Sequence, residues 1–180
     1  MTNITYFVHG TTTDNEKGLA TGWLDGELSE LGRSQAKELG RLVAAKNFDA
    51  IFCSDLKRAV DSAQLAFGNK HKITQDQKLR EINYGDFTQK PDNFKANLAA
   101  YVDQPFPNGE SYLDVEKRIN EFLEFLKKNY DGKNVALVAH QAPQLALEVI
   151  LNKKTWPQAI TEDWRNKKAW QPGWEYVIKN

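Results

Sequence analysis

The chain has 180 residues and carries equal numbers of basic and acidic side chains, 24 of each. This length is typical of one domain with its own core, and we expect a single domain over residues 1–180. The charge balance excludes a global field of the kind that attracts nucleic acid or an anionic membrane, so we expect neither as a partner. Any anion site must therefore be local, and the oligomeric state stays open.

The single cysteine, Cys53, excludes an internal disulfide and a cysteine-built zinc site. No apolar run approaches the roughly 18 residues that cross a bilayer, and Met1 leads into polar residues without the apolar core of a signal peptide. These features favour a reducing, cytoplasmic location.

The first half of the chain alternates strand and helix signals. Residues 4–8 are β-branched and aromatic and predict a buried strand. Ser29 is typical of a helix N-cap and precedes apolar positions at helical spacing as far as Val43. Residues 49–52 predict a second strand, and residues 54–67 indicate a loop that opens into a second helix.

The second half begins with residues 70–110, which predict mainly loops. Ser111 and Asp114 have the spacing of a capping box, and the apolar stripe that follows extends to Leu126, which predicts a helix. The remaining elements are predicted to be an apolar strand, a helix after a proline and a final strand, at residues 135–138, 144–151 and 173–178. This alternation predicts an α/β three-layer sandwich in which helices flank a mainly parallel β-sheet.

Two of the predicted strands end in a histidine, His9 and His140. Ligands of parallel sheets bind outside the carboxyl ends of the strands, where these two side chains could meet. Gly10 leaves room for a ligand to reach backbone N–H groups, and Thr11, Thr12, Thr13 and Asn15 add donors. Arg58, after a third strand, could grip a phosphate through its guanidinium fork. Together these residues predict a site for a phosphate ester.

Each of these residues also has a structural interpretation. A single histidine at a strand end is more often structural than catalytic, and an arginine at a helix start is often a surface residue; it is the combination that favours function. A metal site would need a third ligand, and neither His71 nor Asp14 has a recognisable spacing to the two strand-end histidines. We therefore expect no metal and no cofactor.

Six segments, in order along nearly the whole chain, resemble those of the histidine phosphatase superfamily, also called the phosphoglycerate mutase-like family. They are HGTT with Asn15, the glycine turn and helix start at 22–36, SDLKRA at 54–59, LREINYGDF at 79–87, PNGES at 107–111 and VAHQA at 138–142.

The resemblance implies a metal-independent phosphatase that works through a phosphohistidine. His9 would attack phosphorus, Arg58 and His140 would neutralise the phosphate oxygens, and Glu81 would serve as general acid and then general base. The substrate contacts that it implies are Gly10, Thr12, Asn15, Thr21, Gly22 and Gln141. A surface ion pair with Arg80 is the structural alternative for Glu81. The expected partner is a small-molecule phosphomonoester.

One departure matters, because the family has an arginine directly before the nucleophilic histidine and this chain has Val8. Losing one partner of a buried charge pair commonly costs about 2–5 kcal/mol, or roughly 30-fold to several-thousand-fold in rate for a transition-state contact. Lys57, Arg80 or Arg165 would have to fill the gap, and nothing in the sequence fixes any of them there. Gln141 also stands where the family has a glycine.

Two other functions stay open. The loss of the arginine could leave a catalytically impaired member that binds phosphate compounds or a protein partner without turnover. The other is a phosphoglycerate mutase-type phosphotransferase. Mutases of the family usually carry a longer, more basic insertion where this chain has residues 88–107 with only Lys90 and Lys95 as cations, so the sequence favours hydrolysis.

Two aromatic groups have open roles. The aromatic side chains within the loop-rich segment 70–110 form either a pocket wall or part of the core: Phe87, Phe94, Tyr101 and Phe106. The tryptophans of residues 156–174 form either a partner surface or, as we favour, a packing layer over the last helix.

Overall fold

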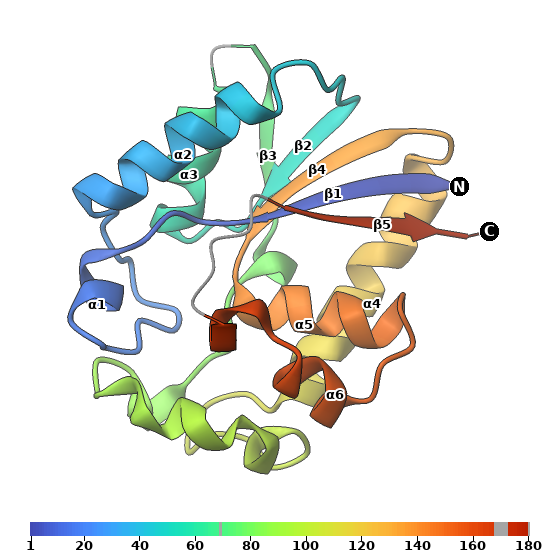
Figure 1. The fold of residues 1–180 in the computed structure, drawn as a ribbon. Helices are drawn as coiled ribbons and strands as arrows, with labels where there is room; N and C mark the ends of the chain where they lie inside the picture. The colour runs from blue at the N-terminus through green and yellow to red at the C-terminus, as the bar shows by residue number, and fades with distance from the viewer. Residues whose placement is uncertain (69, 168–172, 180) are drawn as a thin grey trace.

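A computed structural model describes residues 1–68, 70–167 and 173–179. Its centre is a five-stranded sheet in the order β3-β2-β4-β1-β5 (Figure 1). The strands are β1 (Thr2–Val8), β2 (Ala50–Cys53), β3 (Ile73–Gln75), β4 (Asn134–Ala139) and β5 (Trp174–Ile178). The first four are parallel, and β5 runs antiparallel to β1. Helices flank both faces of this sheet, as the α/β sandwich prediction requires.

The alternating side chains of the strands divide the core into two layers. Phe7 and Val138 face α2 (Glu30–Leu42) and α3 (Lys57–Phe67), which pack on one side of the sheet. Ser29 caps α2 as predicted, because its side chain accepts a hydrogen bond from the Gly32 N–H.

The other face is covered by α4 (Tyr112–Asn129), α5 (Gln141–Ile150) and α6 (Trp156–Thr161). The predicted capping box at the start of α4 is present. Helix α5 begins three residues earlier than predicted, since Pro143 lies in its first turn, where a missing N–H is tolerated.

Short elements account for most of what the sequence pattern did not predict. They are the one-turn helix α1 (Thr13–Glu16), strand β3, helix α6 and four 3₁₀ segments, at Gln77–Leu79, Gly85–Phe87, Asp92–Tyr101 and Trp164–Lys167. None is long enough for a hydrophobic period to stand out. None of the helices within residues 1–68, 70–167 and 173–179 has both the length and the apolar character needed to cross a membrane.

Six side chains of the two aromatic groups lie in the core or pack against it: Phe87, Phe94, Tyr101, Phe106, Trp156 and Trp174. The rings of Phe87 and Phe94 stack at 5.2 Å and those of Tyr101 and Phe106 at 3.8 Å. In the tail, Trp156 lies against Tyr112, and Trp164 lies against Trp174. Trp170 lies outside the described residues.

The register of β1 and β4 sets up the site. Val8 pairs with Ala139, and the His9 N–H donates to the Ala139 carbonyl at 3.0 Å. His9 and His140 therefore leave the sheet at the same level, at the carboxyl ends of adjacent parallel strands.

Candidate active site

His9 and His140 face each other beyond the sheet edge. Their ring centroids are 5.0 Å apart, with the planes inclined by 60°. The His140 ring is completely buried, and neither of its nitrogens finds a hydrogen-bond partner among the residues that the structure describes. Buried polar atoms are normally paired, so the two ring nitrogens of His140 are available to contact a ligand.

The protonation state of His9 follows from its contacts. Its Nδ1 lies 2.7 Å from the Gly10 carbonyl, which can only accept, so Nδ1 carries the hydrogen and Nε2 keeps its lone pair. The Arg58 Nε–H donates to that lone pair at 3.3 Å. Burial, together with the nearby Arg58 charge, lowers the pKa of His9 to about 3. The ring is therefore neutral near pH 7 and nucleophilic at Nε2.

Arg58 is held beside His9 by the loop before α2. The side chain is buried, and its two terminal nitrogens donate to the carbonyls of Gly22 at 2.8 Å and Leu24 at 3.0 Å. Gly22 has a φ of +55°, a conformation that side chains disfavour, and this turn directs its carbonyl at the guanidinium. The loop thus fixes Arg58 where it can contact both His9 and a bound anion.

Glu81 is buried and faces the same space. Its Oε1 accepts from the N–H groups of Ile82 and Ala142, both at 2.9 Å, and its Oε2 accepts from Gln141 N–H at 3.2 Å. The alternative of a surface ion pair with Arg80 is wrong, because Arg80 instead pairs with Asp55 at 2.6 Å.

His9 and Glu81 open into a cavity of about 240 Å³, and the buried side chains of Arg58 and His140 lie behind its lining. Its lining includes four predicted site residues, His9, Glu81, Asn15 and Gln141. The other lining residues are Val8, Thr11, Gln35, Lys95, Trp164 and Arg165. A neutral histidine, a carboxylate and two cations therefore line one small space, which suits an anionic ligand.

Two other predicted contacts support the loops of the site. The Thr12 hydroxyl accepts from Asn15 N–H at 3.0 Å, and the Asn15 side-chain oxygen accepts from Thr12 N–H, which leaves the Asn15 amide nitrogen to donate elsewhere. The Thr21 hydroxyl donates to Asp14 at 2.9 Å. Neither Thr12 nor Thr21 lines the cavity.

Gly10 is needed for packing rather than, as predicted, to let a ligand reach backbone N–H groups. Its N–H donates to the Ser62 hydroxyl at 3.0 Å, so it is already engaged. A Cβ at Gly10 would lie 2.3 Å from the Gly32 carbonyl, so the glycine is needed for the close approach of α2 to the nucleophile loop.

Several lining residues had sequence signals that did not point to the site. Gln35 lies in the helix start that resembles the family, and its Oε1 accepts from the Thr11 N–H at 2.9 Å. Lys95 and Trp164 carry no local signal of a site, and Arg165 was one of three cations that could fill the gap at Val8.

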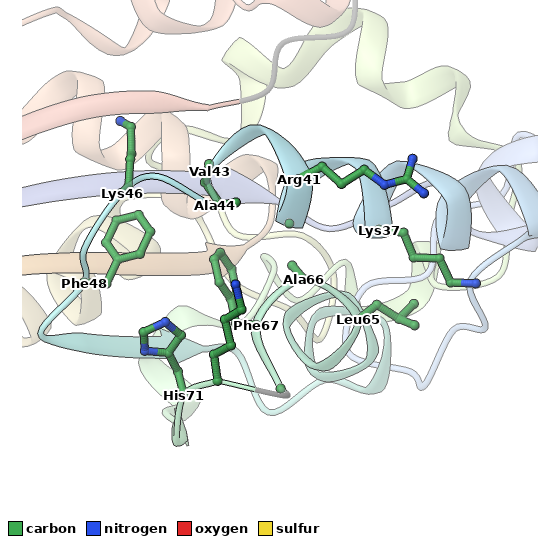
Figure 2. A pocket seen from close by; sticks show the side chains of 13 residues that line it. Lys37, Arg41, Val43, Ala44, Lys46, Phe48, Leu65, Ala66, Phe67 and His71 are labelled. Atoms are coloured by element: carbon green, nitrogen blue, oxygen red, sulfur yellow. The ribbon is translucent and has the colours of Figure 1, made fainter.

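His71 lies in a different hollow, between the carboxyl ends of α2 and α3 (Figure 2). This hollow is larger, at about 420 Å³, but the described residues that line it are basic, apolar or small, and none of them is a carboxylate. Two of its cations already have partners, Arg41 with Glu38 at 3.0 Å and Lys46 with Glu175. It lacks the acid and base chemistry that surrounds His9.

Comparisons with known proteins agree with this geometry. Residues 6–169 match the sequence profile of the histidine phosphatase superfamily, branch 1. A 2,3-bisphosphoglycerate-dependent phosphoglycerate mutase of Methylocella silvestris is 34% identical over 169 residues, which cover 84% of this chain and 82% of the mutase. Phosphoserine phosphatase 1 of Hydrogenobacter thermophilus is 28% identical over 149 residues, 77% of this chain and 71% of that phosphatase.

Among solved structures, a mycobacterial glucosyl-3-phosphoglycerate phosphatase in complex with VO3 superimposes with a TM-score of 0.76 at 30% identity, covering 88% of this chain and 86% of that chain. The α/β sheet of this chain likewise presents a neutral histidine, His9, to a cavity that Glu81 also lines. The match over residues 6–169 identifies the family, and the chain belongs to the histidine phosphatase superfamily.

Proposed function

We propose that the chain hydrolyses a small phosphomonoester through a phosphohistidine on His9. The observation that carries this proposal is the state of His9, whose Nε2 keeps its lone pair because Nδ1–H donates to the Gly10 carbonyl at 2.7 Å. Relatives named as phosphatases support the same reaction.

In the first step the His9 Nε2–phosphorus bond forms as the bond from phosphorus to the leaving oxygen breaks. Glu81 gives its proton to that oxygen, which leaves as an alcohol. In the second step Glu81 takes a proton from water, the water oxygen attacks phosphorus, and the bond to His9 breaks to release inorganic phosphate. No metal takes part in the proposed steps.

Electrostatic stabilisation comes from groups already in place. Arg58 donates to the phosphate from beside the attacking nitrogen, and the unpaired ring of His140, 5.0 Å from the His9 ring, contacts an oxygen. The amide nitrogens of Asn15 and Gln141 are the remaining donors of the predicted set on the cavity wall. Gly10, Thr12, Thr21 and Gly22 act by holding the loops that carry these groups.

The size of the cavity and its cations define the substrate class. A volume of about 240 Å³ admits a metabolite rather than a macromolecule. Lys95 lies on the wall and suits a substrate with a second anionic group, such as a carboxylate. We place the reaction in the cytoplasm, where a free, buried thiol such as Cys53 stays reduced.

Phosphoryl transfer between two organic molecules is the second candidate, because mutases of 30–34% identity are among the relatives. It differs only in the acceptor of the second step. Release of one phosphate for each alcohol from 3-phosphoglycerate would indicate hydrolysis, and isomerisation that depends on 2,3-bisphosphoglycerate would indicate the mutase.

The test is hydrolysis of p-nitrophenyl phosphate by the purified chain, with and without EDTA. We expect turnover that EDTA spares and that His9→Ala abolishes, while His71→Ala, which changes a histidine in the other hollow, leaves it intact. If the parent chain binds phosphate without turnover, it is instead a binding protein that lost catalysis because Val8 replaces the arginine of the family.

A further inference from the structure

Arg165 reaches the catalytic cavity from a part of the chain remote from the other site residues. It lies in the 3₁₀ segment Trp164–Lys167, between α6 and β5, and lines the cavity together with His9 and Asn15. Its positive charge also helps to lower the pKa of His9, after burial and Arg58. The C-terminal segment therefore contributes a charge to the site.

Arg165 is held in place and has one end unpaired. Its Nη1 donates to Asp163 Oδ1 at 2.7 Å, and its guanidinium carbon lies 4.9 Å from the centre of the Trp164 ring. Its Nη2 is buried and has no hydrogen-bond partner within the described residues. A buried, charged N–H without an acceptor is costly, so a ligand oxygen at this point would be strongly favoured.

The hydrogen bonds that hold Arg165 extend through Asp163 to Gln141 and Glu81. Asp163, which is almost completely buried, also accepts a hydrogen bond from the Gln141 side chain. Gln141 in turn donates its backbone N–H to Glu81 at 3.2 Å. Arg165 is thus positioned relative to the acid by two intervening side chains, rather than resting on a free surface segment.

The other cations near the site are committed or placed differently. Lys57 pairs with Asp61 at 2.6 Å, and Arg80 pairs with Asp55 at the same distance. Neither lines the cavity. Lys95 does line it, but its amino group pairs with Asp92 at 3.1 Å. Val8, on the strand side, offers no charge.

We propose that Arg165 is a phosphate-binding residue, whose Nη2 donates to an oxygen of the transferred phosphoryl group and supplies the cation that position 8 lacks. This inference rests on the proposed function, since it assumes a phosphate beside His9. It assigns Asp163 as the residue that positions the guanidinium. Two arginines then bind the phosphoryl group, Arg58 in the first turn of α3 and Arg165 in the 3₁₀ segment Trp164–Lys167.

The test compares Arg165→Ala and Arg165→Gln with two controls. Asn166→Ala removes the exposed side chain that donates to the Ile160 and Thr161 carbonyls, so it loosens the same segment without touching the cavity. Arg41→Ala removes an exposed arginine at the far hollow. Thermal unfolding of each variant shows that it is folded.

For the two Arg165 variants we expect kcat/KM for p-nitrophenyl phosphate to fall about 100-fold, as when a preorganised donor to an oxyanion is removed. The Kd for orthovanadate, measured by calorimetry, should rise by a similar factor. Both controls should stay within about 3-fold of the parent, the range expected when no contact to the phosphate changes.

Unchanged kcat/KM and vanadate affinity in both Arg165 variants would overturn the inference, and so would equal losses in Asn166→Ala. The binding measurement separates this inference from the proposed function. A parent chain that binds vanadate without turnover, and loses that binding on Arg165→Ala, would keep the role of Arg165 while the hydrolase assignment fails. A parent chain that binds no vanadate would end both.

Discussion

Glu81 and Ala142 are joined by a hydrogen bond of 2.9 Å, although 61 positions separate them in the chain. The Glu81 carboxylate lies over the first turn of α5, where it also accepts from Gln141 N–H. The same turn follows His140 directly. The acid and the second histidine are therefore placed by one helix start, and a shift of that helix would move both.

The role of Glu81 predicts a dependence on the leaving group. In Glu81→Gln, kcat/KM should fall about 10²–10⁴-fold for an alkyl phosphate, because general acid catalysis is lost. For p-nitrophenyl phosphate the loss should be smaller, since p-nitrophenolate leaves without a proton. Steady-state kinetics with both esters measure the difference, and equal losses would mean that Glu81 does not protonate the leaving oxygen.

The low pKa of His9 predicts a pH-dependent stability. This pKa is about 3 in the folded chain, against about 6.5 when the chain is unfolded. Between these values the unfolded state binds the extra proton, so the free energy of unfolding falls as the pH drops from about 6.5 towards 3 and is unaffected by His9 above that window.

In His9→Gln the loss of stability between about pH 6 and pH 4 should therefore be shallower than in the parent. Part of the slope will remain, because burial also lowers the pKa of His140. Urea unfolding across this range gives both slopes. Curves that are parallel below pH 6 would show that the pKa of His9 is not lowered.

Tyr6 should matter for both stability and catalysis. Its hydroxyl donates to the His140 carbonyl at 2.7 Å and accepts from the His140 N–H at 3.0 Å, so Tyr6→Phe leaves two buried backbone groups unpaired. We expect a loss of about 1–3 kcal/mol in the free energy of unfolding, together with weaker vanadate binding because His140 is released.

Tyr112→Phe is the matched control for Tyr6→Phe. The Tyr112 hydroxyl is buried, and the described part of the chain provides no hydrogen-bond partner for it. Removing it should change the free energy of unfolding by less than about 0.5 kcal/mol or raise it, since an unpaired polar group is removed from the core. Equal destabilisation by both variants would contradict the assigned contacts.

Gly32 should not tolerate a side chain. A Cβ there would lie 1.9 Å from the Thr11 carbonyl, so Gly32→Ala must push α2 away from the loop after His9. We expect a loss of about 1–3 kcal/mol in spite of the better helix propensity of alanine, together with reduced turnover. Urea unfolding and kinetics measure both effects. Ser34→Ala, at an exposed position of the same helix, should have parental stability and activity.

Lys95 should discriminate among substrates. In Lys95→Gln, KM for 3-phosphoglycerate should rise on the order of 10-fold, the value of one charge-assisted hydrogen bond to the carboxylate. KM for p-nitrophenyl phosphate, which has no carboxylate, should change little. Lys90→Gln alters an exposed lysine of the same segment and serves as control. A similar rise for both substrates would place Lys95 on the phosphate instead.

The sheet and the two histidines could be predicted because their signals are local. Residues 4–8 are β-branched and aromatic and residues 135–138 are apolar, and polar or small residues bound both runs. The residues that follow such strands occupy the same edge of a parallel sheet. Ser29 and Ser111 predicted the starts of their helices, because each caps a helix by bonding to a residue only three positions away. The prediction of α6 was within reach for the same reason, since Thr155 and Gln158 form a capping box.

The route of the C-terminal segment was not predictable in this way. Arg165 lines the cavity because Asp163 bonds to Gln141, a contact between residues 22 positions apart that no periodicity encodes. Likewise, Arg80 was a candidate for the gap at Val8 until its pairing with Asp55, 25 positions away, placed it elsewhere. Local patterns located the two strand-end histidines, but only the tertiary contacts decided which cations lie near them.

The position of β1 in the sheet has a consequence for biosynthesis. Ile4 pairs on one side with Val135 and on the other with Tyr176, so both strands that border β1 are synthesised long after it. Contacts so distant in sequence are slow to form, because a long stretch of chain must be ordered to close them. The nascent chain therefore carries β1 as an unpaired apolar strand until β4 and β5 have been made, and only then can His9 take its place beside His140.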